Sequence, residues 1–194
     1  MDVGNPTTLY NYGKSKIKPM SAKVKAFEYL LVKLVGWHQQ ETQSENNDIS
    51  VLKGMKLLFF VSAVNSPITT EDTLLDKVFN NFVAMPYGHV ESDIYSAIRK
   101  NELENVTIDN YRTTIDNDQI DIDQATKDLI EEAVIKLRSV NKKLILMSPF
   151  DLVELSHKWS SWKVYIARAK RQFVSSASIP TDVIKKEDKI WSLY

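Results

Sequence analysis

The sequence contains no cysteine, which excludes a disulfide-stabilised scaffold, a zinc site built from thiolates and a cysteine nucleophile. It also has no apolar run that approaches the roughly 18 residues needed to span a bilayer. The N-terminal residues Met-Asp-Val-Gly-Asn-Pro do not combine a positive region with an apolar segment. We therefore expect a cytoplasmic protein that has no membrane partner.

Net charge is also absent, because 25 Lys and Arg balance 25 Asp and Glu. The charges are nevertheless unevenly distributed. Residues 1–70 carry 8 basic and 5 acidic side chains (+3), residues 71–132 carry 5 and 15 (−10), and residues 133–194 carry 12 and 5 (+7). Solvated helix faces explain such blocks, and so do charged partners, since complementary charge steers association.

The chain is 43% hydrophobic, enough for a sizeable core in one domain. Apolar residues spaced three and four apart predict helices along most of it. We expect an irregular arm over residues 1–19, followed by a single, mainly α-helical domain over 20–194. Helices are predicted from Ser21 to about 38, over 51–64 after Asp48 or Ser50, from Thr70 toward Phe79, from Asp123 to about 140, from Ser148 to 156, from Ser160 or Ser161 with Phe173 facing inward, and over 182–191.

The segment Phe82–Tyr95 contains three successive sequence patterns. An apolar run over 82–85 predicts a small extended element, and Pro86, Tyr87 and Gly88 impose a turn. From Val90 the pattern becomes helical. We expect a strand, a tight corner and a helix, with the tip of the corner exposed.

The polar passage over residues 101–123 invites a calcium hypothesis because it contains closely spaced aspartates. Neither of its possible loop registers has the glycine that such a loop requires. We therefore predict no calcium site, and we expect no cofactor.

The helix over 51–64 is apolar almost all the way round, which predicts a central position in the domain. Lys53 and Lys56 lie one turn apart on it. We expect these two lysines to share the only edge of this helix that meets water.

Three separated blocks together resemble the Panacea domain, a family of bacterial and phage antitoxins that includes the proteolysis adaptor SocA. The first is Lys53–Val64, the second is Ala84-Met-Pro-Tyr-Gly-His-Val followed by Ile94-Tyr95, and the third is Leu155-Ser-His with Trp162 five residues further on. The order and separation of the blocks are more specific than any one of them, and they cover roughly residues 22–190. His89 departs from the family's usual proline, Gly54 and Met55 replace Leu-Gln, and Trp159 stands where an acidic residue is common.

The resemblance implies a protein that neutralises a cognate toxin, encoded beside it, by direct binding and without catalysis. A helical platform would mask the toxin with exposed aromatic and charged side chains. An equally simple interpretation is structural, with His157 and Trp162 joining two helices. The candidate contact residues are Lys53, Lys56, Tyr87, His89, Tyr95, His157, Trp159 and Trp162.

Three other functions compete with masking. A zinc enzyme would need His38, His89 and His157 to meet, but no two of them have close ligand spacing. A nucleic-acid-binding regulator is suggested by the basic C-terminal third, although the neutral net charge argues against nucleic acid as the main partner. An adaptor that delivers a toxin to a host protease cannot be separated from masking by sequence.

Overall fold

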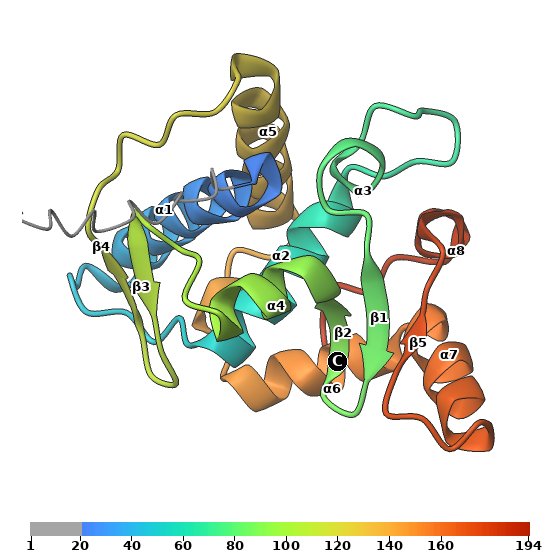
Figure 1. Cartoon of the computed structure of the whole chain (residues 1–194). Coiled ribbons are helices and arrows are strands. Elements are labelled where there is room, and N and C mark those ends of the chain that lie inside the picture. The colour runs from blue at the N-terminus through green and yellow to red at the C-terminus, as the bar shows by residue number, and fades with distance from the viewer. Residues whose placement is uncertain (1–20) are drawn as a thin grey trace, which may run out of the picture.

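The computed structural model describes residues 21–194 and shows a mainly helical single domain with two small antiparallel sheets (Figure 1). This confirms the predicted fold class. The arm expected over residues 1–19 lies outside the described residues. In chain order the elements are α1 (Ala22–Thr42), α2 (Val51–Val64), α3 (Leu74–Lys77), β1 (Phe82–Met85), β2 (Gly88–Glu91), α4 (Ser92–Arg99), β3 (Val106–Ile108), β4 (Thr113–Ile115), α5 (Gln124–Val140), the 3-10 helix η1 (Leu144–Leu146), α6 (Pro149–Lys158), α7 (Ser160–Arg171), β5 (Ala177–Ser178) and α8 (Thr181–Lys186).

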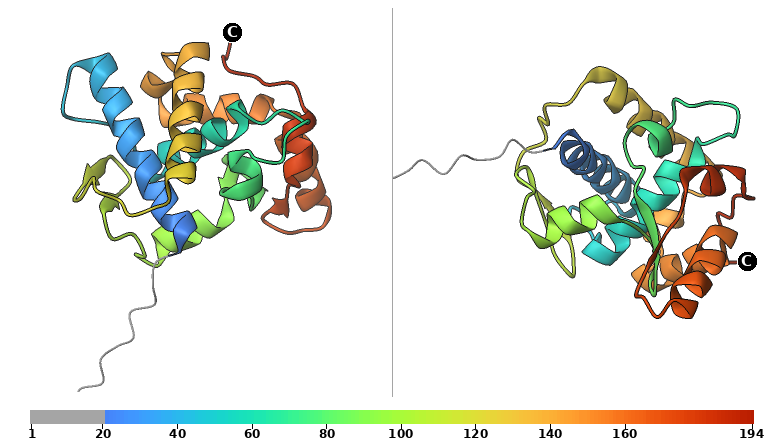
Figure 2. Two further views of the ribbon diagram at one scale, coloured as in Figure 1. Left: turned by 90° about the horizontal axis from the view of Figure 1, so that it is seen from above. Right: turned by 45° about the vertical axis from the view of Figure 1, so that its right-hand side comes forward.

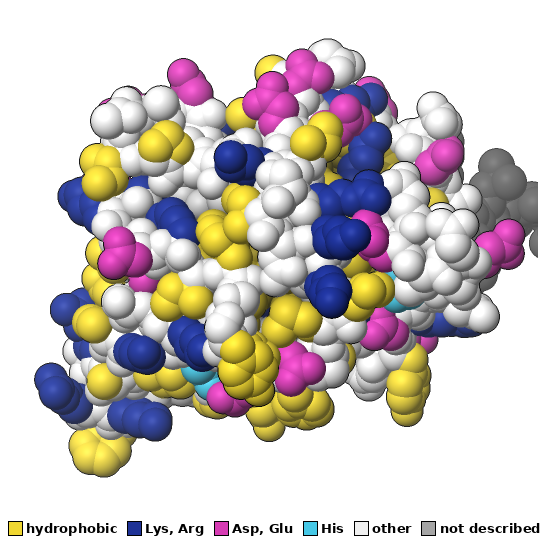
Figure 3. Space-filling model, turned by 180° about the vertical axis from the view of Figure 1, so that it is seen from behind, with side chains coloured by type: hydrophobic (Ala, Val, Ile, Leu, Met, Phe, Trp, Pro, Cys, Tyr) yellow, Lys and Arg dark blue, Asp and Glu magenta, His cyan; other side chains and the backbone are white. Residues whose placement is uncertain are grey.

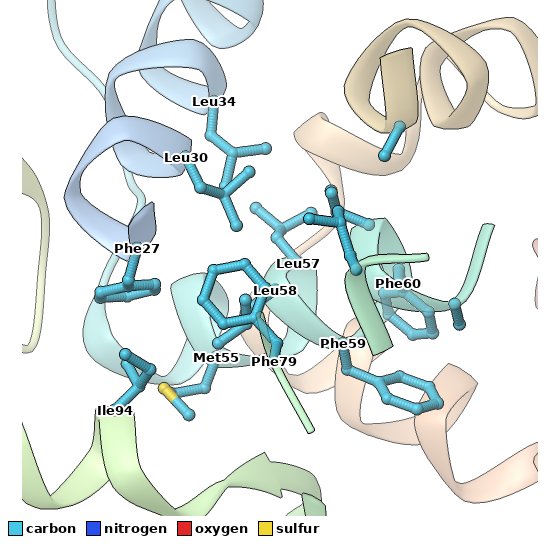
Figure 4. Packing of buried hydrophobic residues seen from close by; sticks show 14 of the residues in the cluster. Phe27, Leu30, Leu34, Met55, Leu57, Leu58, Phe59, Phe60, Phe79 and Ile94 are labelled. Atoms are coloured by element: carbon cyan, nitrogen blue, oxygen red, sulfur yellow. The ribbon is translucent and has the colours of Figure 1, made fainter. Parts of the chain in front are cut away.

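Helix α2 forms the centre of the domain, as its all-round apolar sequence predicts. It packs against α1, α3, α5, α6 and β2, and four consecutive side chains, residues 57–60, are fully buried. Phe27, Leu30 and Leu34 of α1 approach it from one side (Figure 4). The core is therefore assembled from helices that surround α2.

The predicted helix starts are largely confirmed. Ser21, Ser50, Asp123 and Ser148 each accept a hydrogen bond from a backbone N–H in the first turn of α1, α2, α5 and α6 respectively, which satisfies a donor that has no partner within the helix. Trp159, and neither Ser160 nor Ser161, occupies the cap position of α7.

Three other expectations are corrected. Thr73, and not Thr70, forms the capping box of α3 with Asp76. Helix α8 ends at Lys186, short of the predicted residue 191, and the remaining chain forms no helix or strand. Phe173 was expected to face inward but is 96% exposed, because α7 ends before it and the backbone there turns left-handed.

The corner at residues 86–88 joins two strands, and not a strand and a helix as predicted. Met85 pairs with Gly88 and Phe82 with Glu91, so β1 and β2 form a hairpin, and β5 pairs with the other edge of β1. The helix predicted after the corner is confirmed as α4, which starts at Ser92 and is capped by Glu91. Strand β2 was not predicted because all four of its residues, Gly-His-Val-Glu, are buried although two are polar, so they lack the alternation of apolar and polar residues that indicates a strand.

A second hairpin, β3–β4, occupies the acidic passage for which no element was predicted. The buried carboxylate of Glu28 on α1 accepts hydrogen bonds from the backbone N–H groups of Glu104 and Asn105, both at 2.7 Å. This hairpin and the β2–β1–β5 sheet lie on opposite sides of α4 (Figure 1, Figure 2). Within residues 21–194 no helix is both long and apolar enough to cross a membrane.

Candidate functional site: the hairpin turn and the buried histidine below it

The turn between β1 and β2 requires a glycine. Gly88 has φ +94°, a backbone conformation that residues with a Cβ rarely adopt. A Cβ at this position would also stand 2.5 Å from Ser156 Oγ and 2.9 Å from Lys56 Nζ. The hairpin therefore rests directly on α6 and α2.

Two ring donors fix the outside of the turn. His157 Nε2 donates to the carbonyl oxygen of Pro86 at 3.1 Å, and Trp162 Nε1 donates to that of Met85 at 2.8 Å. The two rings stack with centroids 3.7 Å apart. Burial lowers the pKa of His157 below its usual value, while Glu154 and the bond to Pro86 oppose that shift. A neutral His157 with its proton on Nε2 fits this geometry.

His89 lies below the turn and is fully buried. Its ring stacks on Phe59 at 3.7 Å, and its two nitrogens lie 2.8 Å from Ser156 Oγ and 2.7 Å from Ser161 Oγ. Burial, the nearby Lys56 and His157 hold the pKa of His89 well below its usual value. The ring is therefore a neutral group whose nitrogens are both satisfied, as a buried polar side chain requires.

Lys56 supports the hairpin from below. Its ammonium or amine group is fully buried and donates to the carbonyl oxygen of His89. Burial lowers the pKa of Lys56 to about 7, because an ammonium ion in an apolar environment loses its hydration. Both protonation states of Lys56 are therefore accessible near neutral pH.

Trp159 closes this polar cluster on the side of the C-terminal segment. It is fully buried, packs edge to face against Phe59 and Trp191, and donates from Nε1 to the carbonyl oxygen of Ile190 at 3.1 Å. Glu187 accepts a hydrogen bond from the backbone N–H of Ser161 at 2.9 Å, and burial raises the pKa of its carboxyl. The residues after α8 thus complete the surroundings of His89.

The structure corrects the expectation that the candidate residues are exposed. Lys56, His89 and Trp159 are fully buried, since the chain folds the hairpin, α6 and α7 over them. Lys53 is also fully buried, in a separate cluster where it donates to Asp48 at 2.6 Å. The water-facing edge predicted for α2 is therefore wrong.

The other candidate residues are at least partly accessible. Tyr87 is 60% exposed at the tip of the hairpin, as expected for a turn. His157 and Trp162 are half-buried beside it. Tyr95 is half-buried on α4, where the guanidinium of Arg99 lies 6.0 Å from its ring centroid. The structure thus brings six of the eight candidates together at the hairpin and places Lys53 and Tyr95 in other surroundings.

Sequence reasoning missed the partners that hold His89 in place, namely Phe59, Ser156 and Ser161. Ser156 is part of the Leu155-Ser-His block, which offered a signal, but Ser161 was considered only as a helix cap. No local pattern could have paired either serine with His89 across about 70 residues. Among the described residues, no group of three or more His, Asp and Glu side chains is arranged to hold a metal ion.

Comparison with known proteins identifies a family for this part of the chain. The family model described as "Antitoxin SocA-like, Panacea domain" matches residues 55–163, more than half of the 194 residues. The match runs from α2 through the hairpin to the start of α7 and therefore contains the turn, Lys56, His89 and the His157–Trp162 pair. No curated protein and no solved structure gave a match. The chain belongs to the SocA-like Panacea-domain family of antitoxins.

Proposed function

We propose that this protein neutralises a cognate toxin by binding it directly, through the surface around the tip of the β1–β2 hairpin. The observation that carries the proposal is the position of Tyr87 within the matched region. Its side chain is 60% exposed at a turn fixed by two ring donors. A rigid, exposed tyrosine offers a large contact area at low entropic cost.

The buried cluster has a supporting role in this proposal. Lys56 and His89 are inaccessible to a partner, but they determine the height and orientation of the turn through Gly88 and the carbonyl oxygen of His89. His157 and Trp162 are both support and surface, because each is half-buried and bonded to the turn. The contact surface we propose is therefore Tyr87 with the outer edges of His157 and Trp162.

Growth of cells that express the neighbouring open reading frame, with and without this protein, tests the proposal. Co-expression should relieve toxicity, and the two proteins should co-purify. The toxin's half-life should stay unchanged, because masking requires no protease. A markedly shortened half-life would instead assign the protein to delivery for proteolysis.

The variant Tyr87→Ser tests the surface itself. We expect it to weaken the complex about five- to thirtyfold, in line with the loss of about 1–2 kcal/mol when a central aromatic contact is removed. Tyr111→Ser is the matched control, because Tyr111 is 80% exposed near the other hairpin. Full protection by a correctly folded Tyr87→Ser protein would contradict the proposed surface.

A further inference from the structure

The C-terminal end of α7 carries an aromatic side chain in an unfavourable position. Phe173 has φ 55° and is 96% exposed. The N–H of Phe173 donates to the carbonyl oxygen of Lys170 at 3.2 Å, and that of Val174 donates to Ala169 at 3.1 Å. This pattern closes a helix end at which the left-handed residue is usually glycine.

Neither feature of Phe173 contributes to the fold. A left-handed backbone disfavours a residue with a Cβ, and an exposed ring gains nothing from burial. Glycine would remove both costs at this position. Local strain of this kind, held in a well-formed element, points to a role in binding.

Cations with no acidic partner in the described part of the chain lie along α7, the helix that ends before this aromatic. Lys163, Arg168, Lys170 and Arg171 are all exposed. Within residues 21–194 none of their side chains forms an ion pair or a hydrogen bond, although Arg168 lies 4.9 Å from the ring centroid of Tyr165. The sequence has no Asp or Glu over 155–181. Among the described residues, no acidic side chain therefore neutralises the charge on this helix.

The cations border apolar side chains. Val164 is 57% exposed and lies four and seven residues before Arg168 and Arg171, on the same helix face. Val174, next to Phe173, is 51% exposed. Seen from behind, the end of the molecule where α7 lies shows Lys and Arg side chains around exposed hydrophobic ones (Figure 3, lower left).

We infer that this surface, hereafter the α7 surface (Lys163, Val164, Arg168, Lys170, Arg171 and Phe173), binds an acidic face of the toxin, with Phe173 inserted into an apolar recess. The inference rests on the proposed function and extends it. An apolar centre with a charged rim is the arrangement of a protein interface. Aliphatic side chains such as Val164 and Val174 would contribute little to stacking on nucleic-acid bases, and so we favour a protein partner.

The α7 surface and the surface proposed around the hairpin share helix α7. Trp162 lies in the first turn of α7, next to Lys163, and Phe173 lies just beyond its end. A helix of 12 residues is about 18 Å long. One partner of ordinary interface size can therefore contact Tyr87 and Phe173 together.

Phe173→Gly separates binding from stability. The substitution removes the ring and relieves the backbone, so the unfolding midpoint of the full chain should stay unchanged or rise. The affinity for the protein encoded by the neighbouring open reading frame should fall at least tenfold. Ile135→Ser, at a 68% exposed position on α5, is the control and should bind like the wild type.

A matched pair of charge variants tests the rim. Arg168→Gln/Lys170→Gln/Arg171→Gln removes three cations from the α7 surface, whereas Lys136→Gln/Lys142→Gln/Lys143→Gln removes three exposed cations elsewhere. Both triple variants change the net charge equally. Only the variant on the α7 surface should slow association with the same toxin and make the association rate less dependent on salt.

The outcomes are distinguishable. If the wild-type chain relieves toxicity and the α7 variants bind the toxin equally well, the inference is overturned and the proposed function stands. If the α7 variants lose affinity for duplex DNA but still bind the toxin, the α7 surface binds nucleic acid and the inference is again overturned. A wild-type chain that forms no complex with the toxin overturns both.

Discussion

At the scale of single residues, the hairpin is supported by buried polar side chains that a looser fold would leave in water. His89 shows this most clearly. The family resemblance leads one to expect proline at its position, but the backbone N–H of His89 donates to Ser156 Oγ at 3.1 Å, a bond that proline cannot make. Its ring then bonds both serines. Histidine thus replaces the rigidity of proline with hydrogen bonds to α6 and α7.

Lys56 gives the fold a pH dependence whose sign follows from its surroundings. Burial lowers its pKa from 10.5 to about 7, so between these values the unfolded state binds more protons than the folded state. Lys56 therefore contributes a rise in the free energy of unfolding as pH increases across this window. The full shift corresponds to at most about 5 kcal/mol. His89 and His157, which face Lys56, have lowered pKa values and are neutral throughout it.

We expect Lys56→Met to flatten this dependence, because methionine fills similar space without a titrating group. Chemical denaturation of both proteins from pH 6.5 to 10 measures it. The free energy of unfolding of the wild type, minus that of the variant, should increase steadily with pH, and titration of all other groups cancels in this difference. Parallel curves would show that Lys56 has an ordinary pKa in the folded protein.

At the scale of elements, most helices and strand β1 could be predicted from sequence, and the other four strands could not. Serine and aspartate caps and apolar spacing are local signals, which is why α1, α2, α5 and α6 began where expected. The short strands depend on partners elsewhere in the chain, and β5 pairs with β1 across more than 90 residues. The prediction that the site residues are exposed was wrong for the same reason, since Lys56 and His89 are covered by helices that follow them in sequence.

The connection between α7 and the hairpin tip is one element-scale contact that can be measured. Trp162→Phe keeps an aromatic ring beside His157 but loses the bond from Nε1 to the carbonyl oxygen of Met85. We expect a loss of about 1 kcal/mol in the free energy of unfolding, together with faster hydrogen exchange in β1 and β2.

Tyr165→Phe is the matched control for Trp162→Phe. It also removes one polar group from an aromatic ring on α7, but among the described residues the hydroxyl of Tyr165 forms no hydrogen bond. Its unfolding free energy should stay within about 0.5 kcal/mol of the wild type. An equal loss in both variants would mean that the bond to Met85 does not hold the hairpin.

At the scale of the whole molecule, the stable unit is larger than the region that the family model matches. Residues 55–163 contain the hairpin and its support, but α1 lies before them and supplies buried side chains such as Phe27 and Leu30. The irregular chain after α8 follows them in sequence. Both ends therefore pack on the matched region, and its core is incomplete without them.

Removal of residues 187–194 tests this dependence. Trp191 contacts Trp159 and Phe60 edge to face, with ring centroids 5.4 Å and 6.4 Å apart. The carbonyl oxygen of Ile190 accepts the hydrogen bond of the buried Trp159 ring. Truncation uncovers apolar surface and leaves that donor without its partner, so we expect a loss of about 3–5 kcal/mol in the free energy of unfolding.

Urea denaturation of the truncated and intact proteins measures this loss, and the point variant Trp191→Ala should reproduce most of it in a chain of full length. Removal of the fully exposed Tyr194 alone should have no effect. The removed segment contacts two neighbours of His89, because Glu187 accepts a hydrogen bond from Ser161 and Trp191 packs on Trp159. Truncation should therefore also loosen the hairpin tip and weaken toxin binding. A truncated protein that unfolds at the wild-type urea concentration would show that the matched region forms its core without the C-terminal segment.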